Sequence, residues 1–123
     1  MNGNKLFLDS NILLYFLYGD NDVVEIIFDK DVVISFITEL ELLSFPKLTR
    51  DQENNIKELL KNCQLINLNE EIKSLTIELK RKYKLKLPDA IIAATAYYLN
   101  LPLITADKQF KQVEELEIIL YQV

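Results

Sequence analysis

The side chains of this chain that could perform chemistry are mainly carboxylates. Four of them stand where a predicted strand ends or a predicted helix begins: Asp9, Glu41, Asp89 and Asp107. Asn11 and Thr105 add neutral oxygens beside the first and last of these acids. Oxygen donors without imidazole or thiolate favour Mg²⁺ or Mn²⁺, and such ions activate water and stabilise in-line attack on a phosphodiester. The pattern therefore predicts a carboxylate-held divalent cation with these six residues around it.

The composition excludes the main competing chemistries. The chain has 123 residues, no histidine and one cysteine, Cys63. Ser-His-Asp and Cys-His catalysis and the usual zinc sites are therefore excluded, as is an intramolecular disulfide. Half of the residues are hydrophobic and 27% are charged, which is typical of one globular domain over residues 1–123. With no targeting or membrane segment in sight, we expect a cytoplasmic protein.

Strands and helices are predicted to alternate along the chain. Short apolar runs predict strands at 5–9, 31–35, 64–68, 103–105 and 118–121. Capping signals and apolar periodicity predict helices at 11–18, 23–28, 38–45, 49–62, 69–83 and 89–99. In this interpretation Asp22 caps the second helix, Thr38 starts the third, and Glu41 lies in the first turn of that third helix. The order predicts an α/β domain of three layers, with a mostly parallel five-stranded sheet between helices.

The carboxyl ends of strands in such a sheet form the usual ligand crevice, and the four acids fall there. Each acid alone could have a structural role, as a helix cap or as a negative charge at a helix N-terminus. Gathering all four is unfavourable, because each pair at 4 Å repels by about 4 kcal/mol at an effective dielectric near 20. A bound cation or added protons would be needed to offset that repulsion.

The chain carries a net charge of −5, yet residues 80–86 hold five positive charges and no negative one. This stripe could be a solvated helix end, since cations favour helix C-termini. Its position just before Asp89 suggests a second interpretation. Lys82, Lys84 and Lys86 would guide a phosphate backbone toward a pocket that otherwise repels it, and would make binding depend on salt.

Four ordered blocks of sequence resemble the PIN-domain ribonucleases. Leu6-Phe-Leu-Asp9-Ser-Asn11 resembles the opening strand and helix of that family, and the block from Ile34 to Leu43 is similar to its second motif. Leu87-Pro-Asp89-Ala resembles the third motif and Leu103-Ile-Thr105-Ala-Asp107 the fourth. Together the blocks span nearly the whole chain. They are most similar to the small PIN toxins of VapBC-type toxin–antitoxin pairs.

This resemblance implies a Mg²⁺- or Mn²⁺-dependent endoribonuclease, usually dimeric and blocked by a cognate antitoxin. It also implies that Asp9, Glu41, Asp89 and Asp107 form the acidic cluster, while Asn11 and Thr105 orient a carboxylate or a water. Ser10 stands where the family often has threonine. Of the neighbours Glu39 and Glu41, only one can face the pocket on a helix, and the family register favours Glu41.

Two other functions compete with a metal-dependent nuclease. A two-component receiver domain would have adjacent acids after the first strand and an aspartate at the end of the third, but this chain has Asp9-Ser10 and Asn67-Leu68-Asn69. The remaining alternative is a PIN-like module that binds or scaffolds without catalysis. Substituting Asp9 by Asn separates the two, because only an enzyme would lose metal affinity and activity.

Overall fold

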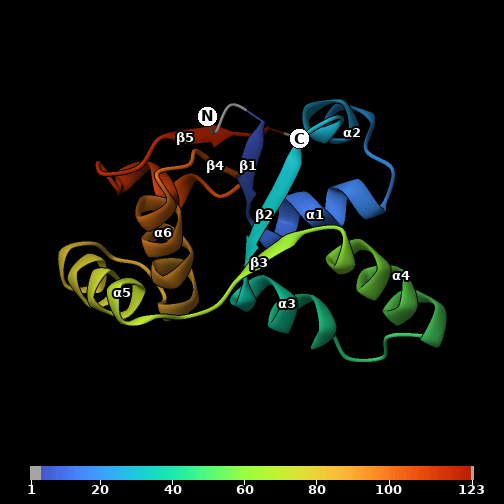
Figure 1. Ribbon diagram of the computed structural model, residues 1–123, viewed down its shortest axis with the longest axis horizontal. Helices are drawn as coiled ribbons and strands as arrows, with labels where there is room; N and C mark the ends of the chain where they lie inside the picture. The colour runs from blue at the N-terminus through green and yellow to red at the C-terminus, as the bar shows by residue number, and fades with distance from the viewer. Residues whose placement is uncertain (1–3, 123) are drawn as a thin grey trace.

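A computed structural model describes residues 4–122 and contains a five-stranded sheet between two layers of helices (Figure 1). The strands are β1 (Lys5–Leu8), β2 (Asp31–Ser35), β3 (Gln64–Ile66), β4 (Leu103–Thr105) and β5 (Ile118–Leu120). They lie in the order β3-β2-β1-β4-β5, and every neighbouring pair is parallel. The expected α/β architecture is confirmed, with a sheet that is parallel throughout.

The helices between the strands cover both faces of the sheet. They are α1 (Ser10–Leu17), α2 (Asn21–Ile27), α3 (Phe36–Leu43), α4 (Arg50–Lys61), α5 (Glu70–Lys82), α6 (Leu87–Leu99) and the short 3₁₀ helix η1 (Lys108–Gln112). Figure 1 shows α5 and α6 on one side of the strands and α1 to α4 on the other. Among residues 4–122 no helix is long and apolar enough to cross a membrane.

Side-chain alternation along the central strands builds a separate core on each face. Phe7, Val33 and Leu103 point toward the α5 and α6 layer. Their neighbours Leu8, Ile34 and Ile104 instead pack with α1, α2, α3 and α4. Strands buried on both faces explain the continuous apolar runs in the sequence, and they fix the strand ends rigidly.

The strand order places a topological switch point between β1 and β4. From the central strand β1 the chain continues to β2 and β3 on one side, then returns to β4 and β5 on the other. The connections that leave β1 and β4 therefore diverge at the carboxyl edge of the sheet and open a crevice there. Asp9 directly follows β1, and Thr105 ends β4.

Three helices begin two residues earlier than expected: α2 at Asn21, α3 at Phe36 and α6 at Leu87 rather than at Asp89. The Ser35 side chain, at the end of β2, accepts a hydrogen bond from the Ile37 N–H, so α3 begins at Phe36 rather than at Thr38. Glu41 consequently lies in the second turn of α3, not the first. The helix α2 is capped by Asp20 instead of Asp22, because the Asp20 carboxylate accepts from the backbone N–H groups of Asp22 and Val23.

Candidate functional site

The Asp9 carboxylate is fixed at the switch point through both of its oxygens. As the N-cap of α1, Asp9 accepts the Ser10 backbone N–H on Oδ1 at 2.7 Å. Its other oxygen, Oδ2, accepts the Thr105 hydroxyl at 2.8 Å. The side chain is 7% exposed, and this burial raises its pKa. Asp9 is thus held in a fixed orientation, caps α1, and carries a carboxylate whose charged form is disfavoured by burial.

Thr105 links Asp9 to Asp107 across the switch point. The fully buried Thr105 hydroxyl donates to Asp9 and accepts the Asp107 backbone N–H at 3.0 Å. Asp107 itself caps η1, since its Oδ1 accepts the Gln109 N–H at 2.9 Å. Asp107 can therefore cap a helix, the structural role considered for it, and lie beside Asp9 at the same time.

Glu41 reaches the same edge of the sheet from the second turn of α3. Its Oε1 accepts the Ser10 hydroxyl at 2.7 Å. The neighbouring Glu39 instead lines a hollow with Leu43 and Lys57 on another side of α3. The structure therefore directs Glu41 toward Asp9, as the helical register predicted, and directs Glu39 away.

Asp89 completes the group from the first turn of α6, where it is half-buried. Its pKa is raised to about 6, first by burial and then by repulsion from Asp9, Asp107 and Glu41. The Lys86 ammonium acts in the opposite direction and lowers that pKa. Four carboxylates from separate segments thus lie close enough to influence one another electrostatically.

The four carboxylates do not converge on a single point in this structure. Within residues 4–122, no three acidic or cysteine side chains converge tightly enough to hold a metal ion as they stand. The donor chemistry, carboxylate and hydroxyl oxygens without imidazole or thiolate, fits Mg²⁺ or Mn²⁺.

The neutral and basic candidates differ in their surroundings. Asn11 lies exposed in the first turn of α1 and makes no side-chain hydrogen bond to another described residue. Lys86 is exposed at the N-cap of α6, three residues before Asp89. Lys84 is also exposed, and its backbone is held by Gln112. All three residues are thus exposed, and Lys86 is the one whose charge acts on Asp89.

Lys82 has a partner that the sequence pattern did not indicate. Its ammonium lies 2.9 Å from Glu115 and 5.4 Å from the centre of the Tyr83 ring. The Tyr83 hydroxyl donates to the same carboxylate at 2.6 Å. Lys82 therefore ties the end of α5 to the segment before β5, which leaves Lys84 and Lys86 as the freer of the three lysines predicted to bind RNA.

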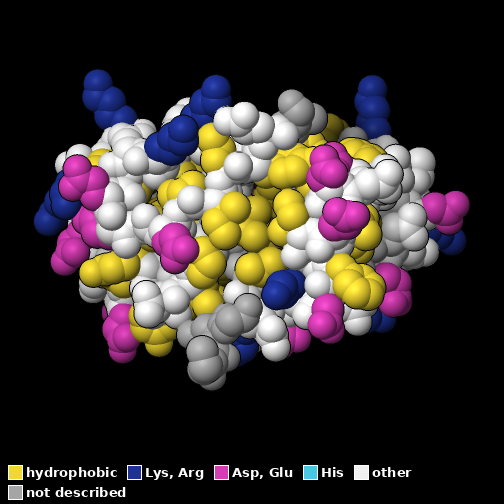
Figure 2. Space-filling view, turned by 90° about the horizontal axis from the view of Figure 1, so that it is seen from above, with side chains coloured by type: hydrophobic (Ala, Val, Ile, Leu, Met, Phe, Trp, Pro, Cys, Tyr) yellow, Lys and Arg dark blue, Asp and Glu magenta, His cyan; other side chains and the backbone are white. Residues whose placement is uncertain are grey.

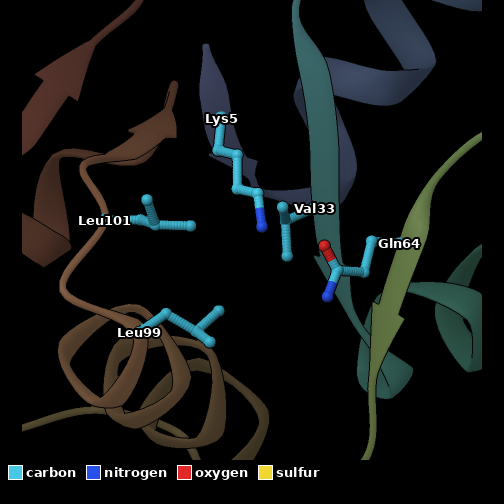
Figure 3. Close-up of a pocket in the computed structure, with 5 residues that line it drawn as sticks. All are labelled: Lys5, Val33, Gln64, Leu99 and Leu101. Atoms are coloured by element: carbon cyan, nitrogen blue, oxygen red, sulfur yellow. The ribbon is translucent and has the colours of Figure 1, made fainter. Parts of the chain in front are cut away.

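A separate hollow near the amino ends of the strands contains none of the predicted residues. It has a volume of about 130 Å³ and is lined by Lys5, Val33, Gln64, Leu99 and Leu101 (Figure 3). The Lys5 and Gln64 side chains point into it from β1 and β3. The face on the side of the chain termini is apolar over its middle, with charged side chains spread around it (Figure 2). Of the four predicted acids at the carboxyl edge, Asp9 and Asp89 combine burial with a raised carboxyl pKa.

Sequence reasoning assigned no role to Ser10 and assigned the wrong one to Thr38. Thr38 is fully buried inside α3, and its hydroxyl oxygen lies 3.2 Å from Ser10 Oγ. The spacing of three residues between Thr38 and Glu41 resembles a capping box, but here it places both side chains on the face that meets Ser10. The signal for Ser10 that the sequence offered was a polar residue directly after Asp9, the acid that follows the buried strand.

The chain is similar to known proteins over most of its length. The family model described as PIN domain matches residues 6–116. The Ribonuclease VapC2 of Methanocaldococcus jannaschii is 30% identical over 142 aligned positions, covering 97% of this chain and 95% of the relative.

Solved structures have the same fold. A toxin–antitoxin complex from Klebsiella pneumoniae contains a chain that is 31% identical, with a TM-score of 0.82 and coverage of 96% of this chain and 99% of that one. The VapBC-1 structure from nontypeable Haemophilus influenzae is 25% identical, with a TM-score of 0.80 and coverage of 94% and 97%. On the match over residues 6–116 and the arrangement of its sheet, the chain belongs to the PIN-domain family.

Proposed function

We propose that this protein is a Mg²⁺- or Mn²⁺-dependent endoribonuclease and the toxin of a toxin–antitoxin pair. The observation that carries the proposal is the set of four electrostatically coupled carboxylates at the switch point of a PIN-domain sheet. The names of its relatives, a ribonuclease and toxins crystallised with antitoxins, support the substrate class and the partner.

Asp9, Glu41, Asp89 and Asp107 would hold the ion. The chemistry supplied by a bound Mg²⁺ or Mn²⁺ is polarisation of a phosphodiester and activation of the attacking water. Asp9 is held rigid by Ser10 and Thr105, so it presents its free lone pairs in a fixed direction. Burial and its acidic neighbours raise the pKa of Asp89 to about 6, and a cation held by the four acids would offset that repulsion.

The surrounding polar and basic residues would position the substrate. Asn11 has free amide donors on the exposed face of α1, which suits it to hydrogen-bond a phosphate or a water beside Asp9. Lys86 lies close enough to Asp89 to lower its pKa. Lys86 and the exposed Lys84 would hold the phosphates that flank the cleaved bond, with Lys82 contributing at the outer end of the stripe. Single-stranded or loop RNA is the proposed substrate. A cognate antitoxin and a second copy of the chain are the proposed protein partners.

The first experiment is a calorimetric Mn²⁺ titration at neutral pH, because it requires no knowledge of the RNA. We expect binding by the natural protein, its loss in Asp89→Asn, and its retention in Asp51→Asn. Asp51 also stands in the first turn of a helix but lies on α4, outside the acidic group. Binding that persists unchanged in Asp89→Asn would contradict the proposed site.

One observation favours a second function, a PIN-like module that binds partners without catalysis: no three of the described acids converge as they stand. Cleavage of a mixed single-stranded RNA pool with Mn²⁺, and its absence with EDTA or in Asp9→Asn, would support the enzyme. If neither the natural protein nor Asp9→Asn binds Mn²⁺ or cleaves RNA, and both still bind the antitoxin, the non-catalytic module is supported.

A further inference from the structure

Ser10 is a buried polar residue between two of the acids. It is 9% exposed and is the first residue of α1, directly after Asp9. Its backbone N–H donates to Asp9 Oδ1 at 2.7 Å, and its hydroxyl donates to Glu41 Oε1 at 2.7 Å. One residue thus contacts carboxylates from two segments that lie far apart in the sequence, and it does so through two independent groups.

The hydroxyl network has a fixed direction when Glu41 is ionised. A serine hydroxyl has one proton, and a carboxylate can only accept, so Ser10 must donate to Glu41. The 3.2 Å contact between Ser10 Oγ and Thr38 Oγ1 can then hold only if Thr38 donates to Ser10. Thr38, Ser10 and Glu41 therefore form a chain of hydrogen bonds that starts in the core and ends at the site.

Glu41 depends on this chain for its orientation. Of the four acids, Glu41 is the exposed one, and its side chain has three torsion angles that must be ordered when it binds an ion. The Ser10 hydroxyl is its one side-chain hydrogen-bond partner among the described residues. Asp9 and Asp107, by contrast, are fixed as helix caps by backbone N–H groups.

We propose that Ser10 is a positioning residue that holds the Glu41 carboxylate, through its hydroxyl, in the orientation needed for a divalent cation. This inference rests on the proposed metal site and deepens it. A partner that orients a metal ligand is worth about 10- to 100-fold in metal affinity. We therefore expect Ser10→Ala to weaken Mn²⁺ binding about tenfold or more.

The experiment is Mn²⁺ calorimetry on the natural protein, Ser10→Ala and Ser10→Thr, with Ser74→Ala as the matched control. Ser74 is an exposed serine on α5, outside the acidic group. Ser10→Thr keeps the hydroxyl and should restore affinity to within about threefold, whereas Ser74→Ala should change nothing. Equal weakening in the alanine and threonine variants would overturn the proposal, because packing rather than the hydroxyl would then matter.

A double-mutant cycle tests whether Ser10 acts through Glu41. Once Glu41→Gln has weakened binding, adding Ser10→Ala should weaken it little further, and additive losses would overturn the proposal. Because Ser10→Ala leaves the buried Thr38 hydroxyl without this partner, the double variant S10A/T38V serves as the folded form if the single variant unfolds.

The failure of this inference is distinguishable from failure of the proposed function. If the natural protein itself binds no Mn²⁺, the metal site is refuted and the role of Ser10 with it. If the natural protein binds and Ser10→Ala binds equally well, the role of Ser10 is refuted while the metal site stands.

Discussion

Replacing Asp89 with asparagine should stabilise the metal-free protein. The Asp89 pKa is about 6 in the folded state against an ordinary value of 3.8, and burial is the main cause. Ionising such a group costs the folded state at most about 3 kcal/mol. Because Asp89 is only half-buried and solvent screens the repulsion, we expect about 1–2 kcal/mol. Asparagine is neutral and similar in size, so it removes this penalty.

The pH dependence has a defined sign. Between about pH 4 and 6 the folded protein retains the Asp89 proton that the unfolded chain releases, so the free energy of unfolding falls as the pH rises through that window. The natural protein should therefore gain stability on acidification from pH 7 to 5 through this group. In Asp89→Asn that contribution is absent, and the difference between the two proteins should be largest above pH 6.

The assay is thermal and urea unfolding in EDTA at pH 7.5 and pH 5, followed by the same series with Mn²⁺. In EDTA at pH 7.5, Asp89→Asn should melt about 4–8 °C above the natural protein. The control Asp51→Asn should lose up to about 1 kcal/mol, because it removes a favourable charge from the first turn of α4. With saturating Mn²⁺ the order should reverse, since a ligand stabilises only the protein that binds it.

Three results would refute this reasoning. Asp89→Asn could be no more stable than the natural protein in EDTA at pH 7.5, which would mean that the ionised Asp89 carboxylate does not destabilise the folded state. Its advantage could persist unchanged at pH 5, which would point to packing rather than charge. Mn²⁺ could stabilise both proteins equally, which would place any bound ion elsewhere.

Other consequences of the structure are testable in the same way. Thr105→Val removes the donor to the buried Asp9, so urea unfolding should show a loss of about 1–3 kcal/mol, whereas Thr105→Ser should keep most of the stability. Lys86→Ala should raise the pKa of Asp89 in an NMR titration and raise the KM for RNA, and an unchanged pKa would contradict the proximity of these two charges. Burial raises the pKa of the Cys63 thiol to about 11, so iodoacetamide at pH 8 should modify it much more slowly than a free cysteine; equal rates would show the thiol to be accessible. Mn²⁺ affinity should fall as the pH drops below 6, because protons compete for Asp89, and a flat profile would exclude Asp89 as a ligand.

The features predictable from sequence are those that local patterns determine. The run 31–35 is apolar and β-branched because both faces of β2 are buried, and it was predicted with its observed limits. Asp9 directly follows such a strand, so its place at the carboxyl edge follows from the parallel topology. The register of α3 likewise distinguishes Glu41 from Glu39, because residues two apart on a helix face nearly opposite sides.

The features that were missed depend on contacts between distant segments or on competing local signals. Asp20 and Asp22 lie on either side of the first residue of α2, and the sequence allows either as its cap. The observed cap is Asp20, which also accepts the Tyr121 hydroxyl from near the other end of the chain. Lys82 has the sequence surroundings of a free surface lysine, but the fold places Glu115 beside it. No pattern within a single segment contains such information.

Asp9 and Asp89 both have a carboxyl pKa raised by burial, and they differ in the hydrogen bonds they accept. The Thr105 hydroxyl and the Ser10 backbone N–H donate to Asp9, and these bonds oppose the effect of its burial. The pKa of Asp89 is lowered by the charge on Lys86, while burial and its three acidic neighbours raise it to about 6. Asp89 is therefore the acid whose charge responds most directly to a proton or a cation. Near neutral pH, Asp89 must bind a proton, bear the repulsion or share a cation with its neighbours, and the last option offsets the repulsion for all four acids at once.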